Sequence, residues 1–153
     1  MSDDEASRVR THALAALARR EHSKLELVRK LKSRGFAAET VAGVLDDLET
    51  TRLQSDTRHA EAYTRSRAER GYGPQRIAAE LKARGSDTEL IHRGLADFDT
   101  EWVARARQAD RKKFGIHPDH SFAALAKRRR FLEYRGFTAE QINDALKIDS
   151  DLD

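Results

Sequence analysis

The residues best suited to chemistry in this sequence are basic side chains that gather on predicted helices. Arginine outnumbers lysine 21 to 8, and the guanidinium fork of arginine matches the oxygens of phosphate and carboxylate groups. Between Thr100 and Arg135, ten Lys and Arg stand against four Asp and Glu, a local charge of +6; from Gly136 onward one Lys stands against five acids, a local charge of −4. These stretches predict an anionic partner, and the alternative interpretation is an ordinary solvated ionic surface.

Ten basic residues are the candidates for binding such a partner, and they fall on three predicted helices. If these helices are repeated along one axis, they present a curved row of positive charge. Such a row suits a long anionic partner, either a nucleic acid or a nucleoprotein fibre. Aromatic residues are few, at 7% of the chain, so base stacking is expected to be a weak part of binding. The predicted binding residues are Arg65, Arg67, Arg70, Arg105, Arg107, Arg111, Lys112, Lys113, Lys127 and Arg130.

The basic run 127–130 is predicted to divide into two roles. Successive helical residues are turned by about 100°, so four in a row cannot share one face. Lys127 and Arg130 point away from the apolar side of this helix and are expected to be exposed. At least one of Arg128 and Arg129 is expected to be partly buried and paired with a carboxylate or a helix C-terminus, because an unpaired buried charge is too costly. The alternative is that all four are solvated.

Other kinds of chemistry find little support in the sequence. Cysteine is absent, which excludes a zinc-thiolate site and a thiol nucleophile. Gly71-Tyr72-Gly73-Pro74 resembles a fragment of a phosphate loop, but the proline lacks a backbone donor, so we interpret it as a tight turn packed by Tyr72. His117 and His120 have no evident third ligand. We therefore expect neither an enzyme nor a bound cofactor or metal.

The elements that must position the basic residues are predicted to be helices. Alanine occurs 23 times and leucine 15 times, while valine and isoleucine together total ten, a composition that favours helix over strand. Arginine–glycine pairs at 34–35, 84–85 and 135–136 are typical of helix ends, because glycine just past a helix adopts a positive φ without steric cost. The glycines are 50 and 51 residues apart, which indicates an internal repeat.

The repeat extends to the residues around each glycine. A leucine lies four residues before it, at Leu31, Leu81 and Leu132, and an acid and then a helical apolar stripe follow it. We predict an all-α fold of three tandem three-helix repeats stacked into an elongated, curved array, with a compact nine-helix globule as the alternative. The predicted boundaries are 1–52, 53–98 and 99–148 for the repeats, followed by an acidic tail at 149–153.

Capping patterns and prolines predict where helices begin. The first helices of the repeats are expected near 5–20, 56–70 and 100–114. Ser23-x-x-Glu26 and Thr138-x-x-Gln141 are capping boxes, and either Ser86-x-x-Glu89 or Asp87 opens another helix. Proline is favoured at a first helical position, so Pro74 begins one helix and Pro118-Asp119 is expected to begin the matching helix of the third repeat.

Several of these segments together resemble the RecX family, over nearly the whole chain from Ala15 to Leu146. The Gly-Tyr-Gly-Pro segment followed by Arg-Gly is the most specific part of the resemblance. One departure is Ser86, which stands where the other two repeats have phenylalanine. The matching segments are His22-Ser23-x-x-Glu26-Leu27, Arg34-Gly35-Phe36, Arg70-Gly71-Tyr72-Gly73-Pro74-x-Arg76-Ile77, Glu80-Leu81, Arg84-Gly85, Lys113-Phe114-Gly115, Arg130-Phe131-Leu132 and Arg135-Gly136-Phe137.

This resemblance implies a fold of three three-helix repeats and a regulator of the bacterial RecA recombinase. Proteins of this kind bind the groove of the RecA–DNA filament and lower its recombinase, ATPase and co-protease activities, in DNA repair and the SOS response. The implied partners are the RecA nucleoprotein filament and single- or double-stranded DNA, without a membrane or a small-molecule substrate. Two alternatives stay open: a module that binds naked DNA through the same arginines, and a purely structural helical scaffold.

The sequence also bears on where the protein acts. It contains no apolar run of 18 residues that could span a membrane. Its first residues, Met1-Ser2-Asp3-Asp4-Glu5, are acidic and polar, whereas a secretory signal has a basic start and an apolar stretch. We therefore expect a cytoplasmic location.

Overall fold

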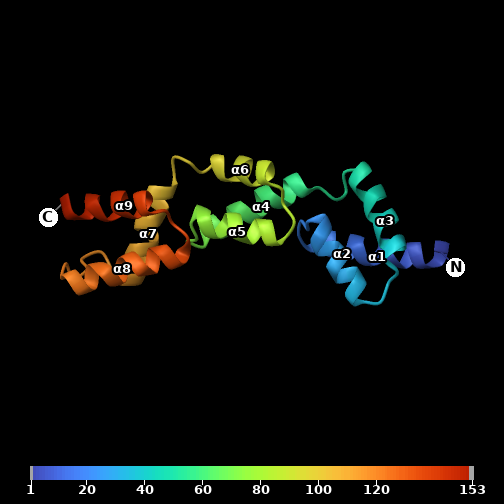
Figure 1. Cartoon of the computed structure of the whole chain (residues 1–153), viewed down its shortest axis with the longest axis horizontal. Coiled ribbons are helices and arrows are strands. Elements are labelled where there is room, and N and C mark those ends of the chain that lie inside the picture. Colours follow the sequence, from blue (N-terminus) through green and yellow to red (C-terminus); the bar gives the residue numbers. More distant parts are fainter. Residues whose placement is uncertain (1, 152–153) are drawn as a thin grey trace. The chain divides into compact units, whose positions relative to one another are not determined.

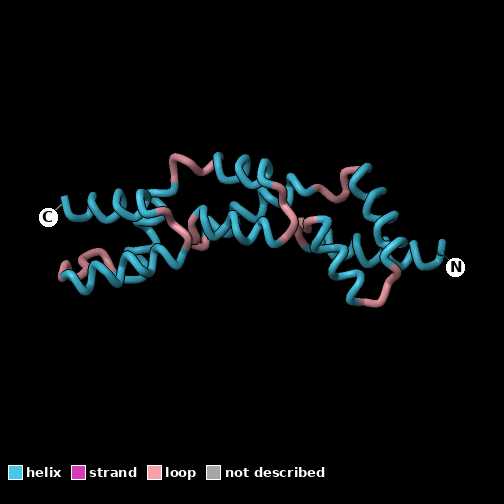
Figure 2. The backbone as a smooth tube through the Cα atoms, in the orientation of Figure 1, coloured by secondary structure: helices cyan, strands magenta, loops and turns pink. Residues whose placement is uncertain are grey.

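The computed structural model describes residues 2–151, which form helices joined by loops (Figures 1 and 2). Within these residues there is no strand, so the prediction of an all-α fold is confirmed. The nine helices of this part of the chain are α1 (Ser2–Arg19), α2 (Lys24–Ser33), α3 (Ala38–Thr50), α4 (Asp56–Glu69), α5 (Pro74–Ala83), α6 (Thr88–Ala96), α7 (Trp102–Phe114), α8 (Phe122–Arg135) and α9 (Ala139–Asp151).

The helices follow the predicted repeat of three, but the chain divides into two compact units. The first unit consists of Met1–Ala62 with Leu81–Leu90, and the second consists of Tyr63–Glu80 with Ile91–Asp153. The middle repeat, α4 to α6, therefore contributes residues to both units. Helix α9 continues to Asp151, and the last two residues of the predicted acidic tail lie outside the described residues.

In the first unit, α1, α2 and α3 pack against one another around an aliphatic core. The apolar stripe predicted after Gly35 is confirmed on α3, because Val41, Val44, Leu45 and Leu48 are buried. Burial of such side chains is the main favourable contribution to folding, at roughly 1.5–3 kcal/mol for a large aliphatic residue. The core residues are Val9, Ala13 and Ala16 on α1, Leu27 and Leu31 on α2, and Val41, Val44, Leu45 and Leu48 on α3.

In the second unit, α7 packs against both α8 and α9 (Figure 1). Trp102 and Ala106 of α7 are buried, as are Leu132 of α8 and Ile142 of α9. Leu132 is 0% exposed, and its counterparts Leu31 and Leu81 are 1% and 0% exposed. The leucine before each repeat glycine is therefore a core residue in all three repeats.

The predicted helix starts are mostly confirmed. Ser23 forms both bonds of its capping box with Glu26. The Thr138 amide donates to Gln141 Oε1 at 2.9 Å, and the Gln141 amide donates to Thr138 Oγ1 at 3.1 Å. Of the two predicted caps of α6, Ser86 and Asp87, the structure shows Asp87, whose Oδ1 accepts from the Leu90 amide at 2.9 Å. Pro74 is the first residue of α5, as predicted.

The predicted start of α8 at Pro118-Asp119 is wrong. The helix begins at Phe122, and Ser121 is its N-cap, with Oγ accepting a bond from the Ala124 amide at 3.2 Å. Asp119 instead accepts from the Ser121 amide at 2.9 Å. The aspartate therefore stabilises the turn before the helix, while the serine satisfies an amide of its first turn.

Two main-chain turns meet in each unit and form what we call the repeat joint. In the first unit, Ser23 Oγ donates to the Arg84 carbonyl at 2.6 Å. In the second unit, the Gly73 amide donates to the Arg135 carbonyl at 2.7 Å, and the Gln75 amide donates to the Gly136 carbonyl at 2.9 Å. Ser23 and Gly73 hold the same repeat position, so a residue before the second helix of one repeat bonds the end of the next repeat's second helix.

The repeat glycines take the backbone conformation that was predicted. Gly35, Gly85 and Gly136 have φ angles of 90°, 94° and 99°, in the region that favours glycine. At Gly136 the neighbouring chain is also close, because an added Cβ would lie 2.3 Å from Arg76 Cβ. The glycine there allows both the turn and the contact with α5.

Candidate anion-binding site

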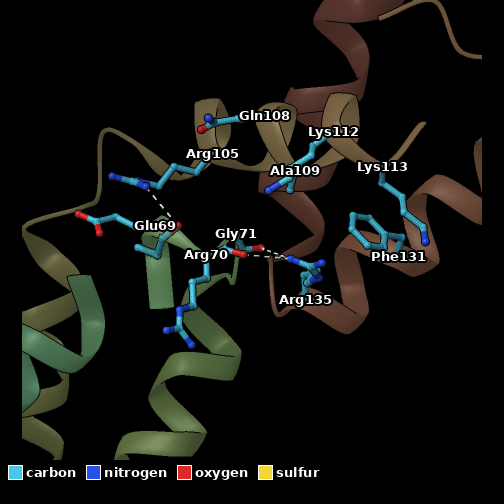
Figure 3. A pocket seen from close by; sticks show the side chains of 11 residues that line it. Glu69, Arg70, Gly71, Arg105, Gln108, Ala109, Lys112, Lys113, Phe131 and Arg135 are labelled. Atoms are coloured by element: carbon cyan, nitrogen blue, oxygen red, sulfur yellow. Dashed lines mark hydrogen bonds between the residues drawn. The ribbon is translucent and has the colours of Figure 1, made fainter. Parts of the chain in front are cut away.

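Five basic side chains surround one cavity of about 300 Å³ in the second unit (Figure 3). The end of α4 supplies one wall, and α7 and α8 supply the others. A single acid, Glu69, lines the same cavity, so its formal charge excess is +4. We call it the cationic pocket, and it is lined by Ala68, Glu69, Arg70, Gly71, Arg105, Gln108, Ala109, Lys112, Lys113, Phe131 and Arg135.

Arg105 is held in place by α4 and by its own helix. Its Nη1 donates to the Ala68 carbonyl at 3.1 Å, and its Nε and Nη2 donate to Glu101 Oε1 at 3.2 and 3.0 Å. The guanidinium also lies 5.3 Å from the centre of the Phe98 ring. The Ala68 carbonyl also accepts from the Gly71 amide at 3.0 Å, so Arg105 adds a second bond at the end of α4 and its positive charge is fixed beside the pocket.

Arg135 is fixed in a similar way from the other side of the pocket. Its Nη1 lies 3.2 Å from the Arg70 carbonyl and 3.4 Å from the Gly71 carbonyl (Figure 3). Its guanidinium lies 4.9 Å from the Tyr72 ring centre and 4.8 Å from that of Phe131. Cation–π contacts of this kind hold a guanidinium against an aromatic face.

The other three cations of the pocket are exposed. Within the part of the chain that the structure describes, the side chains of Arg70 and Lys112 have no hydrogen-bond or ion-pair partner. Lys113 Nζ lies 6.0 Å from the centre of the Phe131 ring. The pocket therefore combines two fixed guanidiniums with three long, exposed basic side chains.

The pocket brings together four of the ten predicted binding residues, namely Arg70, Arg105, Lys112 and Lys113. Arg135 also lines the pocket, although its place in the sequence indicated only a basic residue at a helix end. Its position in the basic stretch from Thr100 to Arg135 could have indicated it as a binding residue. Its contact with the turn after α4 could not be deduced from that segment.

Arg67 lies outside the pocket and forms an ion pair with Glu80. Its Nε and Nη2 donate to the two Glu80 oxygens at 2.9 and 3.0 Å, and its guanidinium lies 3.8 Å from the Tyr72 ring centre. Burial acts to lower the pKa of Arg67, but the bonds and charge of Glu80 outweigh it and raise that pKa. Arg67 and Tyr72 thus stabilise the turn before α5, as predicted for Tyr72.

The remaining predicted residues are spread over three helices. Arg65 on α4 and Arg111 on α7 are exposed, and Arg107 is half-buried. Lys127 and Arg130 are exposed on α8, as expected for the basic run. These five residues do not line the cationic pocket.

The predicted burial of an arginine of the basic run is confirmed at Arg128. This arginine is 2% exposed, and its Nε and Nη2 donate to Asp110 Oδ1 and Oδ2 at 2.9 and 2.7 Å. Asp110 on α7 is itself fully buried, at 0% exposed. The pair joins α7 to α8 and leaves the other basic residues of the run near the surface.

The described residues offer neither a metal site nor a membrane span. Among the described residues, no group of three or more His, Asp or Glu side chains is arranged to hold a metal ion. None of the helices in that part of the chain has the length and apolar content needed to cross a bilayer.

The fold and the site together define an all-helical repeat protein with a cationic pocket. Three family models match the chain: the first three-helix domain of RecX at residues 10–48, the second at 55–95 and the third at 99–146. The chain therefore belongs to the RecX family.

Whole-chain comparisons agree with this assignment. The chain is 42% identical over 135 residues to the regulatory protein RecX of Legionella pneumophila (strain Corby), covering 88% of this chain and 90% of that one. It is 40% identical over 138 residues to the regulatory protein RecX of Pseudomonas entomophila (strain L48), covering 90% and 89%. The crystal structure of RecX from Lactobacillus salivarius has the same fold, with a TM-score of 0.83, 21% identity and coverage of 99% of each chain.

Proposed function

We propose that this chain binds the RecA–DNA filament and inhibits its recombinase, ATPase and co-protease activities. In this role it is a cytoplasmic regulator without catalytic activity of its own. The name of the relatives indicates a regulatory protein, and the proposal adds the partner and the activities that are inhibited.

The observation that carries the proposal is the cationic pocket in a chain made of three RecX domains. The DNA of a nucleoprotein filament carries one phosphate per nucleotide, and a site with a formal charge excess of +4 is attracted to such a polyanion. Arg105 and Arg135 are already held by backbone carbonyls. Little side-chain freedom of these two residues is therefore lost when a partner binds.

The test is the ATPase activity of RecA on single-stranded DNA, measured with and without this protein. We expect the activity to fall as the protein is added, and the Arg70→Ala, Lys112→Ala double variant to inhibit less. Lys147→Ala serves as the matched control, because Lys147 is exposed on α9 and lies outside the pocket. An ATPase activity that is unchanged by excess wild-type protein would contradict the proposal.

The amount of protein needed distinguishes two ways of inhibiting. A regulator that acts at a growing filament end needs fewer copies than one that coats every subunit. We expect inhibition below one copy per RecA subunit. Inhibition that always requires one copy per subunit would instead indicate coating of the filament groove.

A further inference from the structure

We infer that the cationic pocket binds the phosphodiester backbone of DNA, so that the DNA of the filament, and not the recombinase protein, contacts these residues. The inference rests on the proposed function, and it specifies that the DNA of the filament is the component that binds at the cationic pocket. It follows from the charge of the pocket, from its aromatic ring, and from the bonds that its arginines leave unused.

The charge of the pocket calls for an anion with several acceptor oxygens. Five basic residues and one acid, Glu69, line the cavity, and a second acid, Glu101, is paired with Arg105, so positive charge remains in excess. Like charges held close together repel one another, and a bound anion relieves that repulsion. A polyanion such as a nucleic acid also releases condensed counterions when basic side chains replace them.

The two fixed arginines retain donors for such an anion. A guanidinium carries five N–H bonds. Arg135 uses Nη1 for the carbonyls of Arg70 and Gly71, and in the described structure its Nε and Nη2 have no hydrogen-bond partner. Arg105 uses Nε, Nη1 and one Nη2 bond. Both side chains can therefore bind a phosphate oxygen without leaving their present partners.

Phe131 argues against recognition of a base. It is the one aromatic residue among those that line the pocket. Arg135 lies 4.8 Å from its ring centre, Lys113 Nζ lies 6.0 Å from it, and Phe114 meets it edge-on at 5.5 Å. The ring is thus engaged by neighbours and orients two cations. A ligand is bound here through its charge, independently of base sequence.

The composition of the pocket also argues against a protein partner. The centres of protein–protein interfaces are depleted in charged residues, lysine included, and rely on buried aromatic anchors. Here Lys112, Lys113 and Arg70 are exposed, and the half-buried ring of Phe131 is already in contact with Arg135 and Phe114. Exposed basic side chains around fixed guanidiniums are typical of contacts with a phosphate backbone.

The inference is tested by the binding of labelled oligothymidylate to the full chain without recombinase, over a range of salt concentrations. We compare the wild type, the Arg70→Ala, Lys112→Ala double variant, and the control Lys147→Ala. The double variant should bind more weakly, and its slope of log affinity against log salt should be smaller by about 1.4, because each lost single-strand contact removes about 0.7. The control should keep the wild-type slope. Melting curves establish that all three chains fold.

Competitors distinguish the possible sources of the anion. Unlabelled oligothymidylate and oligodeoxyadenylate should displace the probe equally well from the wild type. Stronger displacement by thymidine triphosphate than by tripolyphosphate would overturn the inference in favour of a free nucleotide. Stronger displacement by polyglutamate than by DNA of equal charge would overturn it in favour of an acidic protein segment, and so would equal salt slopes for the double variant and the wild type.

The two proposals can fail separately. If the wild type inhibits the recombinase ATPase and the double variant binds DNA as the wild type does, the inference fails while the proposed function stands. If the double variant loses DNA binding but the wild type leaves the ATPase unchanged, the DNA site stands while the proposed function fails.

Discussion

The side chains of Arg128 and Asp110 face each other inside the second unit, 2% and 0% exposed. Both charges have been removed from water, and two hydrogen bonds of 2.9 and 2.7 Å compensate them. Such a pair contributes less net stability than its bonds suggest, because desolvation opposes them. Removing one partner is nevertheless costly, since the other charge stays buried.

We therefore predict that Arg128→Ala lowers the free energy of unfolding by about 3 kcal/mol, the usual loss for half of a buried pair. Arg130→Ala, two residues further along the same helix and exposed, should change it little. Denaturant titration of both variants measures the difference. If the two variants had equal midpoints, the buried pair would not contribute to stability. The apolar double variant Arg128→Met, Asp110→Leu should recover much of the loss.

Glu26 gives a prediction about acid stability. Its carboxylate accepts from the Ser23 amide at 3.0 Å and from Arg20 at 3.1 Å, and it lies 3.0 Å from His59 Nε2. Burial acts to raise the pKa of Glu26, but the contacts with His59, Arg20 and Ser23 outweigh it and hold the pKa well below its ordinary value of 4.5. The folded state therefore favours the charged form, and its stabilising effect is present above about pH 4.5 and is lost as the pH falls.

The matching experiment compares Glu26→Gln with Glu39→Gln, an exposed acid of the next helix. Stability of the wild type should fall as the pH is lowered below 4.5. Glu26→Gln should be less stable at neutral pH and should show a shallower fall in acid, while Glu39→Gln should follow the wild type. An unchanged acid slope in Glu26→Gln would show that this carboxylate does not control acid unfolding.

At the scale of helices and turns, two equivalent glycines offer a controlled comparison. Gly35 and Gly136 have φ angles of 90° and 99°. An added Cβ meets nothing within 4 Å at Gly35, whereas at Gly136 it would lie 2.3 Å from Arg76 Cβ and 2.6 Å from the Arg76 amide nitrogen. Both alanine variants incur the backbone cost of a positive φ, about 1 kcal/mol, but only Gly136→Ala must also move α5.

We predict that Gly136→Ala is less stable than Gly35→Ala by more than the difference between their φ angles could cause. Thermal unfolding of the two variants measures this. Equal melting temperatures would mean that the turn after α8 shifts freely, which the contact with Arg76 does not support.

Helices and turns were also the scale at which the sequence was most informative. Leucine, glycine and glutamate recur at fixed offsets, so the repeat could be read without a structure. The start of α8 could not, because Asp119 and Ser121 are both good capping residues and only the fold decides which of them caps. The cationic pocket was also beyond the sequence, since Arg105 and Arg135 meet carbonyls 37 and 65 residues away. The burial of at least one of Arg128 and Arg129 could be predicted from the apolar side of the helix, but the sequence did not distinguish between the two.

For the whole molecule, the three tandem repeats predict an extended arrangement of the three-helix domains, because in repeat proteins each repeat contacts only its neighbours in the sequence. A compact chain of 153 residues has a radius of gyration of about 15 Å. We expect solution scattering to give a clearly larger value. A value near 15 Å would instead support the compact nine-helix alternative.

The repeat joint of the second unit determines which substitutions the protein can accept during evolution. Its two bonds run from the amides of Gly73 and Gln75 to the carbonyls of Arg135 and Gly136, so both partners are main-chain atoms that every substitution except proline retains. Where Gly73 meets Gly136, an added Cβ would lie 2.5 Å from the opposite backbone. Sequence drift can therefore replace most side chains around this joint, provided that these two positions stay without a side chain.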